Sequence, residues 1–485
     1  MSAPDYTRRS VIAAGAGLAG AFGLGLFGRA NPAPAGDAVV ESSGGALELE
    51  LEARFGAVEL AGRRAQLFSY AGRVPGPRIE ARPGDEVALR FVNALPEPTN
   101  LHFHGLHVPP TGNADNVFLE VPAGEELTYR FKIPENHPAG TFWYHPHLHG
   151  LVAKQVFLGM AGLFVVRGEL DQVPEVAAAR EVFAVLKDFQ IAGGRVPPPG
   201  PMELARGREG SLVTVNGEVE PEWSVEGGGL LRLRLLNAST ARFYRLKLEG
   251  HPLYLIATDG GALEEPYELD ELLLAPGERA EVLVRADREP GRYTLWNLPY
   301  DRGRGGMMGG GMMGGGFGDT RPRALAHLVY SGRRRTPLPL PERTGRVREL
   351  GAPVRRRRFV LGHSMQPGRG MVFTINGQVF NPRRIDTRVR LGTVEEWEIA
   401  NLGVLDHPFH LHTNPFQIVA RDGRPERLRA WKDTVLVPAG GTVRLRVGFA
   451  DYPGNAVYHC HILEHEDLGM MGIVRFETSG GASGT

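Results

Sequence analysis

The sequence has very little cysteine and no net charge. One cysteine among 485 residues excludes an internal disulfide framework and any zinc or iron–sulfur site built from four thiolates. Lysine and arginine together number 55, as do aspartate and glutamate, so the basic excess of a general nucleic-acid binder is missing and we expect no nucleic-acid partner. Because 16 histidines stand against this one cysteine, any metal chemistry must depend mainly on imidazole.

Beyond its N-terminus the sequence also lacks an apolar run long enough to span a membrane. Residues 1–35 combine Arg8-Arg9, a Gly/Ala-rich apolar stretch and an Ala-x-Ala site that ends at Ala35, which is typical of a signal peptide of the twin-arginine type. A membrane anchor is the alternative, but the stretch of about 17 residues is shorter than the roughly 20 that a spanning helix needs. We expect export by the twin-arginine (Tat) machinery to the periplasm or the cell exterior, followed by cleavage without stable membrane insertion.

Three segments of the chain repeat the same order of landmarks. Each has a turn signal, then alternating apolar and polar residues that end at an asparagine (Asn93, Asn237 or Asn401), which is the periodicity of a strand. Three such turn-rich copies predict an all-β chain of three consecutive Greek-key β-sandwich domains. We place the domains at residues 40–168, 175–332 and 345–478.

The copies differ at the positions nine and eleven residues after this asparagine. Histidines occupy these positions in the first and third copies, namely His102, His104, His410 and His412. The second copy has Leu246 and Leu248 there. A later strand carries two further pairs, His145 with His147 and His459 with His461, in the same two copies. Domains 1 and 3 are therefore predicted to carry the chemistry, and domain 2 to be a spacer without metal.

The four His-x-His pairs point to metal binding, because side chains alternate along a strand and both imidazoles of a pair face the same way. Histidine alone does not select among copper, zinc, iron and nickel. Cys460 lies between His459 and His461 and faces the other side, with His465 and Met470 following closely. Two histidines, a thiolate and a weak axial methionine are typical of a blue-copper electron-transfer site.

These motifs resemble the four copper motifs of three-domain bacterial multicopper oxidases, in the laccase-like and cuprous-oxidase branch. The motifs are Leu-His102-Phe-His104-Gly, Trp143-Tyr-His145-Pro-His147, His407-Pro-Phe-His410-Leu-His412 and His459-Cys460-His461-x3-His465-x4-Met470. They follow one another over almost the whole mature chain. The resemblance implies three cupredoxin-like domains and four copper ions, one of type 1, one of type 2 and a type 3 pair.

The resemblance also implies ligands for each copper. Type 1 copper would be bound by His407, Cys460 and His465, with Met470 axial. Type 2 copper would take His102 and His410. The type 3 pair would take His104, His145, His147, His412, His459 and His461. Because these eight cluster histidines come equally from domains 1 and 3, we expect the trinuclear cluster between those domains.

The implied activity couples one-electron oxidation of a substrate at type 1 copper to four-electron reduction of O2 to water at the trinuclear cluster. Our hypothesis is that Cys460 passes each electron onward through its neighbours His459 and His461. Asp115 and Glu466 resemble the family's proton-relay acids, and solvated surface acids are the alternative for both.

The substrate is suggested by residues 303–318, which are rich in glycine and contain Met307, Met308, Met312 and Met313. Thioether is a soft ligand that selects Cu(I), and such insertions occur in the cuprous-oxidase branch. We therefore predict a Cu(I)-collecting loop late in domain 2 and a role in copper homeostasis, with a linker of no specific function as the alternative. A laccase-like oxidase of phenolic compounds and a non-catalytic copper-binding envelope protein are the alternative functions. We expect a monomer.

Overall fold

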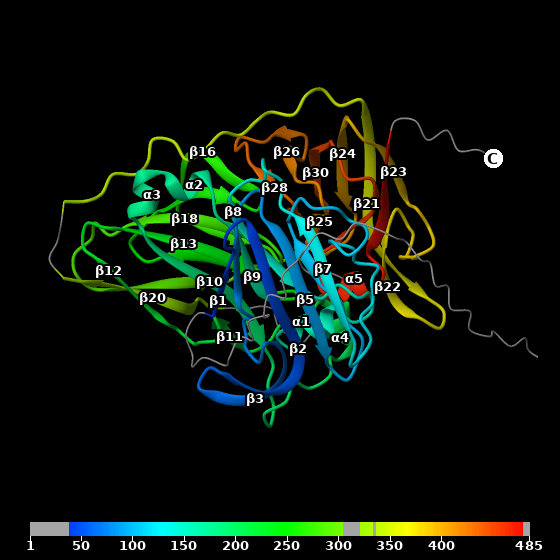
Figure 1. Ribbon diagram of the computed structural model, residues 1–485, viewed down its shortest axis with the longest axis horizontal. Coiled ribbons are helices and arrows are strands. Elements are labelled where there is room, and N and C mark those ends of the chain that lie inside the picture. The colour runs from blue at the N-terminus through cyan, green and yellow to red at the C-terminus, as the bar shows by residue number, and fades with distance from the viewer. Residues whose placement is uncertain (1–37, 304–320, 333–335, 479–485) are drawn as a thin grey trace, which may run out of the picture.

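The computed structural model describes residues 38–303, 321–332 and 336–478. The predicted signal segment (1–35) and the four methionines of the predicted Cu(I) loop lie outside these residues. The described chain confirms the all-β prediction, since six sheets form three two-sheet sandwiches. In Figure 1 the domain made of green strands lies on the left, and the blue to cyan and the yellow to red strands form the other two.

Domain 1 has one sheet of order β3-β2-β5-β7 and another of order β1-β4-β9-β8-β6. Its strand β5 alternates buried and less buried residues, with Val87, Leu89 and Phe91 in the core, as a sheet with one covered face requires. The strands are β1 (Val39–Glu41), β2 (Ala46–Leu60), β3 (Arg63–Tyr70), β4 (Arg78–Ala81), β5 (Glu86–Ala94), β6 (His102–His104), β7 (Glu126–Lys132), β8 (Gly140–His145) and β9 (Gly162–Val166).

Domain 2 has sheets of order β11-β10-β13-β18-β15-β16 and β12-β20-β19-β14-β17. Its central strand β13 is buried along its whole length, because domain 1 covers the face that the domain 2 core leaves open; Trp143 of domain 1 packs there with Leu236. The strands are β10 (Arg180–Phe189), β11 (Leu212–Val215), β12 (Glu222–Glu226), β13 (Leu230–Asn237), β14 (Tyr244–Leu248), β15 (Leu253–Thr258), β16 (Gly261–Leu269), β17 (Leu272–Leu274), β18 (Arg279–Arg285), β19 (Arg292–Leu298) and β20 (Arg323–Ser331).

Domain 3 has sheets of order β22-β21-β24-β30-β26-β27, with β28 paired to β26, and β23-β32-β31-β25-β29. Trp397 is fully buried at the centre of its core. The strands are β21 (Arg355–Gln366), β22 (Gly370–Ile375), β23 (Thr387–Arg390), β24 (Thr393–Asn401), β25 (His407–Leu411), β26 (Phe416–Arg421), β27 (Arg424–Pro425), β28 (Trp431–Lys432), β29 (Thr434–Val437), β30 (Thr442–Phe449), β31 (Gly454–Cys460) and β32 (Met471–Glu477).

Short helices contribute to the contact between domains 1 and 3. Helices α1 (Val152–Phe157) of domain 1 and α5 (Leu463–Asp467) of domain 3 lie close together (Figure 1). Val156 and Leu463 pack against each other between them. Asp467 also accepts hydrogen bonds from the backbone N–H groups of Gly150 and Ala153, at 2.7 and 2.9 Å. The other helices are α2 (Glu169–Gln172), α3 (Pro174–Ala178) and α4 (Pro201–Arg206). None of the helices among the described residues has the length and apolar character to cross a membrane.

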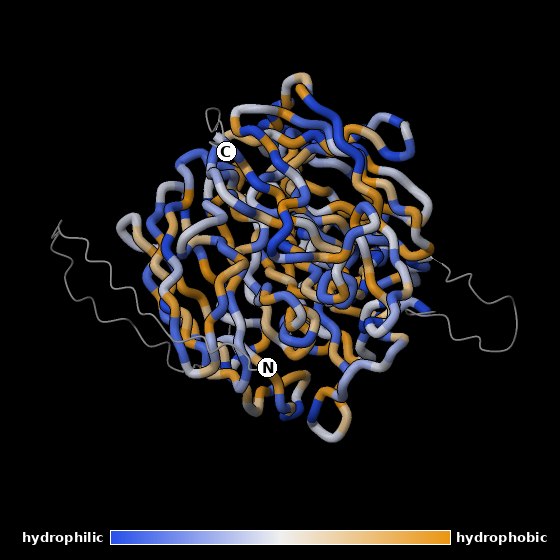
Figure 2. Tube along the Cα trace, turned by 90° about the vertical axis from the view of Figure 1, so that its right-hand side faces the viewer, coloured by the Kyte–Doolittle hydropathy of each residue, from blue (hydrophilic) through white to orange (hydrophobic). Residues whose placement is uncertain are grey.

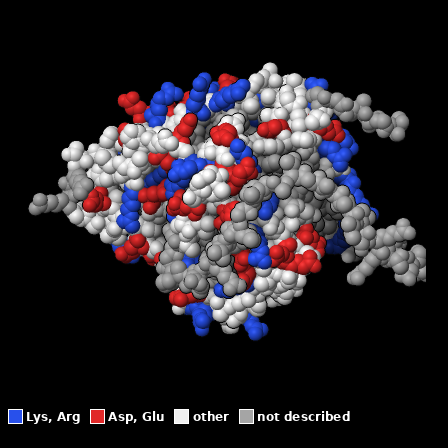
Figure 3. Space-filling view, in the orientation of Figure 1, with Lys and Arg blue, Asp and Glu red and all other residues white. Residues whose placement is uncertain are grey.

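Hydrophobic and charged residues are distributed as the composition of the chain predicts. Along the chain trace in Figure 2, hydrophobic and hydrophilic residues alternate over short distances, as strands with one buried face require. On the face shown in Figure 3, acidic and basic side chains are interspersed among the described residues, in keeping with the zero net charge.

Candidate metal centre

Two strand pairs, one in domain 1 and one in domain 3, bring the predicted cluster histidines together. His102 on β6 lies opposite His145 on β8, and His410 on β25 lies opposite His459 on β31. All eight of these histidines are buried: His102, His104, His145, His147, His410, His412, His459 and His461. Rings of the two domains stack, since the centroids of His104 and His410 are 3.8 Å apart. The histidines therefore form one group at the interface of domains 1 and 3.

Ligand atoms of these histidines converge in several sets, each within 4.8 Å. Three sets consist of histidines alone: His104 with His145 and His461, His147 with His412 and His459, and His102 with His104 and His410. The first two contain the six histidines that the resemblance assigns to a type 3 pair. The third joins the two predicted type 2 ligands, His102 and His410, to His104.

Hydrogen bonds on one ring nitrogen leave the other nitrogen free to bind a metal. Nδ1–H of His145 donates to the carbonyl of Pro146, and Nδ1–H of His410 donates to that of Asp433. His104 is arranged the other way round: its Nε2 lies 3.1 Å from Asp433 Oδ1, and its Nδ1 lies 3.4 Å from His145 Nε2. The buried Nε2 atoms of His102 and His410 have no hydrogen-bond partner, as a site shaped for a metal requires.

Burial favours the neutral form of His102 and His147 in this group. Burial, followed by the neighbouring histidines, lowers the pKa of His102 well below its usual value, and burial lowers the pKa of His147 to about 4. A neutral imidazole is the form that binds a metal. The donor set therefore fits copper, which imidazole ligands suit.

A second buried group surrounds Cys460. Its Sγ lies 3.3 Å from His407 Nδ1 and 3.9 Å from His465 Nδ1. Met470 is fully buried in the same core and receives the Cys460 backbone N–H on its carbonyl at 3.1 Å. Burial raises the pKa of the Cys460 thiol well above its usual value, so the thiolate form here depends on a bound cation. Nitrogen and sulfur donors in this arrangement fit the blue-copper type of site.

The two predicted acids occupy contrasting places. Asp115 accepts hydrogen bonds from His102 Nδ1 at 2.8 Å and from the Phe103 backbone N–H at 2.8 Å, and burial raises its pKa to about 8. Glu466 lies 3.1 Å from His459 Nδ1, and although burial opposes it, the surrounding histidines lower its pKa to about 2. Both carboxyl groups are buried beside the cluster histidines and are not surface acids.

Two residues of the site, Asp433 and Arg279, were not predicted from the sequence. Asp433 contacts His104 and His410, and Arg279 of domain 2 binds Asp433 through two hydrogen bonds. Neither residue belongs to a repeated motif, and the pair is 154 positions apart in the sequence. The sequence holds only weak signals for them: Asp433 directly precedes β29, the strand beside β25, and Arg279 follows the Pro-Gly-Glu turn of domain 2.

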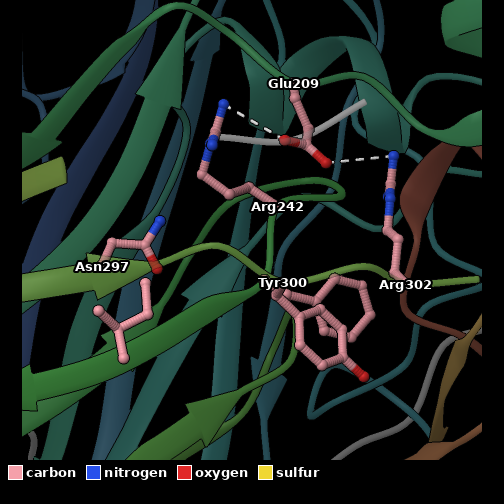
Figure 4. Close-up of a pocket in the computed structure, with 7 residues that line it drawn as sticks. Glu209, Arg242, Asn297, Tyr300 and Arg302 are labelled. Atoms are coloured by element: carbon pink, nitrogen blue, oxygen red, sulfur yellow. Dashed lines mark ion pairs between the residues drawn. The ribbon is translucent and has the colours of Figure 1, made fainter. Parts of the chain in front are cut away.

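A small pocket lies where domain 2 approaches the Cys460 group. Figure 4 shows Glu209 between two arginines, with ion pairs of 3.3 Å to Arg242 and 3.2 Å to Arg302. Tyr300, in the same pocket, donates its hydroxyl to Asp406 Oδ2 at 2.6 Å. Asp406 precedes His407, so the pocket wall is linked directly to this metal-site segment.

Family models described as multicopper oxidase match three parts of the chain, residues 53–171, 189–312 and 355–479. The multicopper oxidase mco of Staphylococcus haemolyticus is 30% identical over 84% of this chain and 83% of its own length. The cell division protein FtsP of Escherichia coli is 32% identical over 85% of each chain.

Among solved structures, a multicopper oxidase of Campylobacter jejuni, described as a metallo-oxidase, is similar over 90% of this chain and 92% of its own. The TM-score is 0.80 and the sequence identity is 32%. The three sandwiches are accordingly cupredoxin domains, and the histidine and cysteine groups are consistent with the type 1 and trinuclear copper sites of such oxidases.

Proposed function

This chain belongs to the multicopper oxidases, and we propose that it oxidises Cu(I), with phenolic compounds as further donors, and reduces O2 to water. The observation that carries the proposal is the position of Cys460 in the chain. It is buried, and its two neighbours in the sequence, His459 and His461, belong to the histidine cluster. When bound, copper supplies one-electron chemistry at the cysteine group and oxygen chemistry at the histidine cluster.

The ligand roles follow the geometry. We assign His407, Cys460, His465 and Met470 to type 1 copper, and His102 and His410 to type 2 copper. We assign His104, His145 and His461 to one type 3 ion and His147, His412 and His459 to the other. Because Cys460 is bonded through the backbone to His459 and His461, the protein provides a continuous covalent path between the two groups.

Two buried carboxyl groups contact different histidines of the cluster. Asp115 receives Nδ1–H of His102 and fixes the ring so that Nε2 faces the cluster. Glu466 faces Nδ1 atoms of His147 and His459, at 3.6 and 3.1 Å. We propose that both relay protons toward the cluster: Asp115, whose pKa of about 8 keeps it protonated at neutral pH, gives its own proton, and Glu466, which is ionised there, accepts protons and passes them on.

The donor side is at His407 in this proposal. Nε2–H of His465 donates to the Ala205 carbonyl of α4 at 3.3 Å, so that ring is covered. A Cβ at Gly403 would lie 3.6 Å from His407 Nε2 and 3.9 Å from His363 Nδ1, so Gly403 lies against both rings beside the buried His407. His363 is exposed, and Met365 on the same strand is 71% exposed. An exposed thioether and an exposed imidazole on this strand, close to Gly403, favour Cu(I) as donor.

The methionine-rich segment begins next to the residues that lie between Gly403 and His407. Arg302 receives the Asp406 backbone N–H on its carbonyl at 2.8 Å, and a Cβ on Gly303 would meet the Val404 carbonyl at 2.2 Å. This supports the proposal that Met307, Met308, Met312 and Met313 deliver Cu(I) to the type 1 site.

Three variants test the type 1 assignment. Cys460→Ser should abolish the blue absorption and turnover. Met470→Leu should keep the blue band but shift the reduction potential, since the axial ligand tunes it. Met471→Leu is the control, because Met471 packs with Val117 and Ile473 in a separate cluster. A blue, active Cys460→Ser enzyme, or fewer than four coppers per wild-type chain, would overturn the proposal and favour a non-catalytic envelope protein.

Deletion of residues 303–318 separates the two donors. We expect Cu(I) oxidation to fall much more than oxidation of a soluble phenol. Equal losses would favour the laccase-like alternative.

We also propose export through the twin-arginine pathway to the periplasm or the cell exterior. Replacing Arg8-Arg9 by Lys-Lys should retain the protein in the cytoplasm, measured by cell fractionation. Unchanged export of this variant would contradict the proposal.

A further inference from the structure

Arg279 of domain 2 reaches a point where all three domains meet. Its side chain is buried, and its Nη1 and Nη2 donate to Asp433 of domain 3 at 2.8 and 2.5 Å. Its Nε donates to the carbonyl of Thr141 in domain 1 at 3.0 Å. Carbonyls of Gly277 and Asp259 accept its remaining hydrogen bonds, at 3.1 and 3.0 Å. All donors of this guanidinium are therefore used in a fixed geometry.

Asp433 transmits this geometry to the histidine cluster. Its Oδ1 lies 3.1 Å from His104 Nε2 and accepts the Thr434 hydroxyl at 2.8 Å. Its backbone carbonyl accepts Nδ1–H of His410 at 2.8 Å. One aspartate thus orients a histidine from domain 1 and a histidine from domain 3. For His104 it also selects the tautomer that presents Nδ1 to the cluster.

The backbone is shaped around the same pair. Gly105, with φ +86°, follows His104, and a Cβ there would lie 2.4 Å from Arg279 Nη2 and 2.5 Å from Asp433 Oδ2. Gly277, on the domain 2 turn before Arg279, would with a Cβ come within 2.9 Å of the His461 ring. Domain 2 therefore packs closely against the segments that carry His104 and His461. It supplies no ligand to the metal-binding sets found among the described residues.

We propose that Arg279 is a positioning residue for the trinuclear site. By holding Asp433 with two hydrogen bonds, it sets the orientation of His104 and makes copper binding between domains 1 and 3 depend on the docking of domain 2. The inference rests on the proposed function only in that the cluster binds copper. Partners of this kind change metal affinity by about 10- to 100-fold when removed.

A purely structural role is the competing explanation, and Arg234 provides the matched control. Arg234 is also fully buried in domain 2 and also contacts Thr141, through Oγ1 at 3.2 Å. Its other partners include Glu281 and Glu181, at 2.8 and 2.6 Å, and no described hydrogen bond or ion pair joins it to a cluster histidine.

The experiment compares Arg279→Gln, Arg279→Lys and Arg234→Gln with the wild-type chain. Urea unfolding of the copper-free proteins measures stability, and titration with copper against a competing chelator measures affinity. Absorption and electron paramagnetic resonance separate the copper types. We expect both glutamine variants to be destabilised without copper. Only Arg279→Gln should lose about 10- to 100-fold in affinity at the type 2 and type 3 positions, with its blue type 1 band kept.

Arg279→Lys should recover part of this affinity, because lysine keeps the charge but cannot form both hydrogen bonds in one plane. It also serves if Arg279→Gln does not fold. Wild-type affinity in both Arg279 variants, or an equal loss of affinity in Arg234→Gln, would overturn the inference. Failure of the wild-type chain to bind copper at the cluster would instead overturn the proposed function.

Discussion

The three domains contain an equivalent pair of strands, but domain 2 carries different side chains on it from domains 1 and 3. Leu246 lies opposite Asn297 in the strand pair β14–β19. The equivalent pairs are His102 with His145 in domain 1 and His410 with His459 in domain 3. The leucine belongs to the apolar core of its domain, whereas the histidines face one another across an interface.

The difference teaches that the sandwich does not by itself create the metal centre. The same pair of strands packs an apolar core when it carries leucine and offers ligands when it carries histidine. A site also requires two domains whose histidine-bearing strands face each other. Domain 2 contributes to that arrangement through the hydrogen bonds that Arg279 donates to Asp433 of domain 3.

The largest predicted effect comes from giving domain 3 the domain 2 residue. His412→Leu places leucine where domain 2 has Leu248. We expect the type 3 signal to disappear and turnover to fall by more than about 1000-fold, because residues that act as a unit fail together. The blue band should remain, since His412 is not part of the Cys460 group. Steady-state oxygen consumption and absorption spectra measure the two effects; near-normal turnover would contradict the assignment.

The second prediction concerns the equivalent strand in the core of domain 2. Leu246→Ala should destabilise the protein by about 3 kcal/mol, because a fully buried leucine leaves a cavity. Copper per chain should stay unchanged, as measured by metal analysis beside urea unfolding. His102→Ala is the comparison, and it should lose copper. If Leu246→Ala lost copper with no loss of stability, the contrast between core and site would be wrong.

The sequence was sufficient for the strands and the histidine groups because both are local signals. Alternation along a strand and the spacing His-x-His are set by neighbouring residues, as at His102 and His104. The Arg279–Asp433 contact was not predictable in this way, since it depends on how three separately folded domains dock. Nor does the sequence indicate that His104 presents Nδ1, because that tautomer is set by Asp433.

A finer change removes the proton that the Asp115 carboxyl can transfer and keeps the shape of the side chain. Asp115→Asn keeps an oxygen that can accept hydrogen bonds from His102 and from the Phe103 backbone. We expect copper content to be kept and kcat to fall about tenfold, the lower end for a group that supports a metal ligand. KM for the donor should not change, because the donor side lies at His407. Steady-state kinetics with two donors test this; a raised KM with normal kcat would place Asp115 in donor binding instead.

The smallest predicted effect concerns His137, a histidine of domain 1 that lies outside the cluster. His137 Nδ1–H donates to the Pro138 carbonyl and Nε2 accepts the His107 backbone N–H. Burial, opposed by the first of these hydrogen bonds and reinforced by His107, lowers the pKa of His137 from 6.5 to about 4.

Between these pH values the unfolded chain binds a proton that the folded chain does not, so stability falls as the pH drops below about 6.5. From pH 7 to pH 5.5 the expected loss is about 1 kcal/mol. His137→Gln should remove this part of the pH dependence, measured as the difference in urea midpoint from the copper-loaded wild-type protein. An unchanged difference between the two pH values would mean that His137 keeps its ordinary pKa in the folded protein.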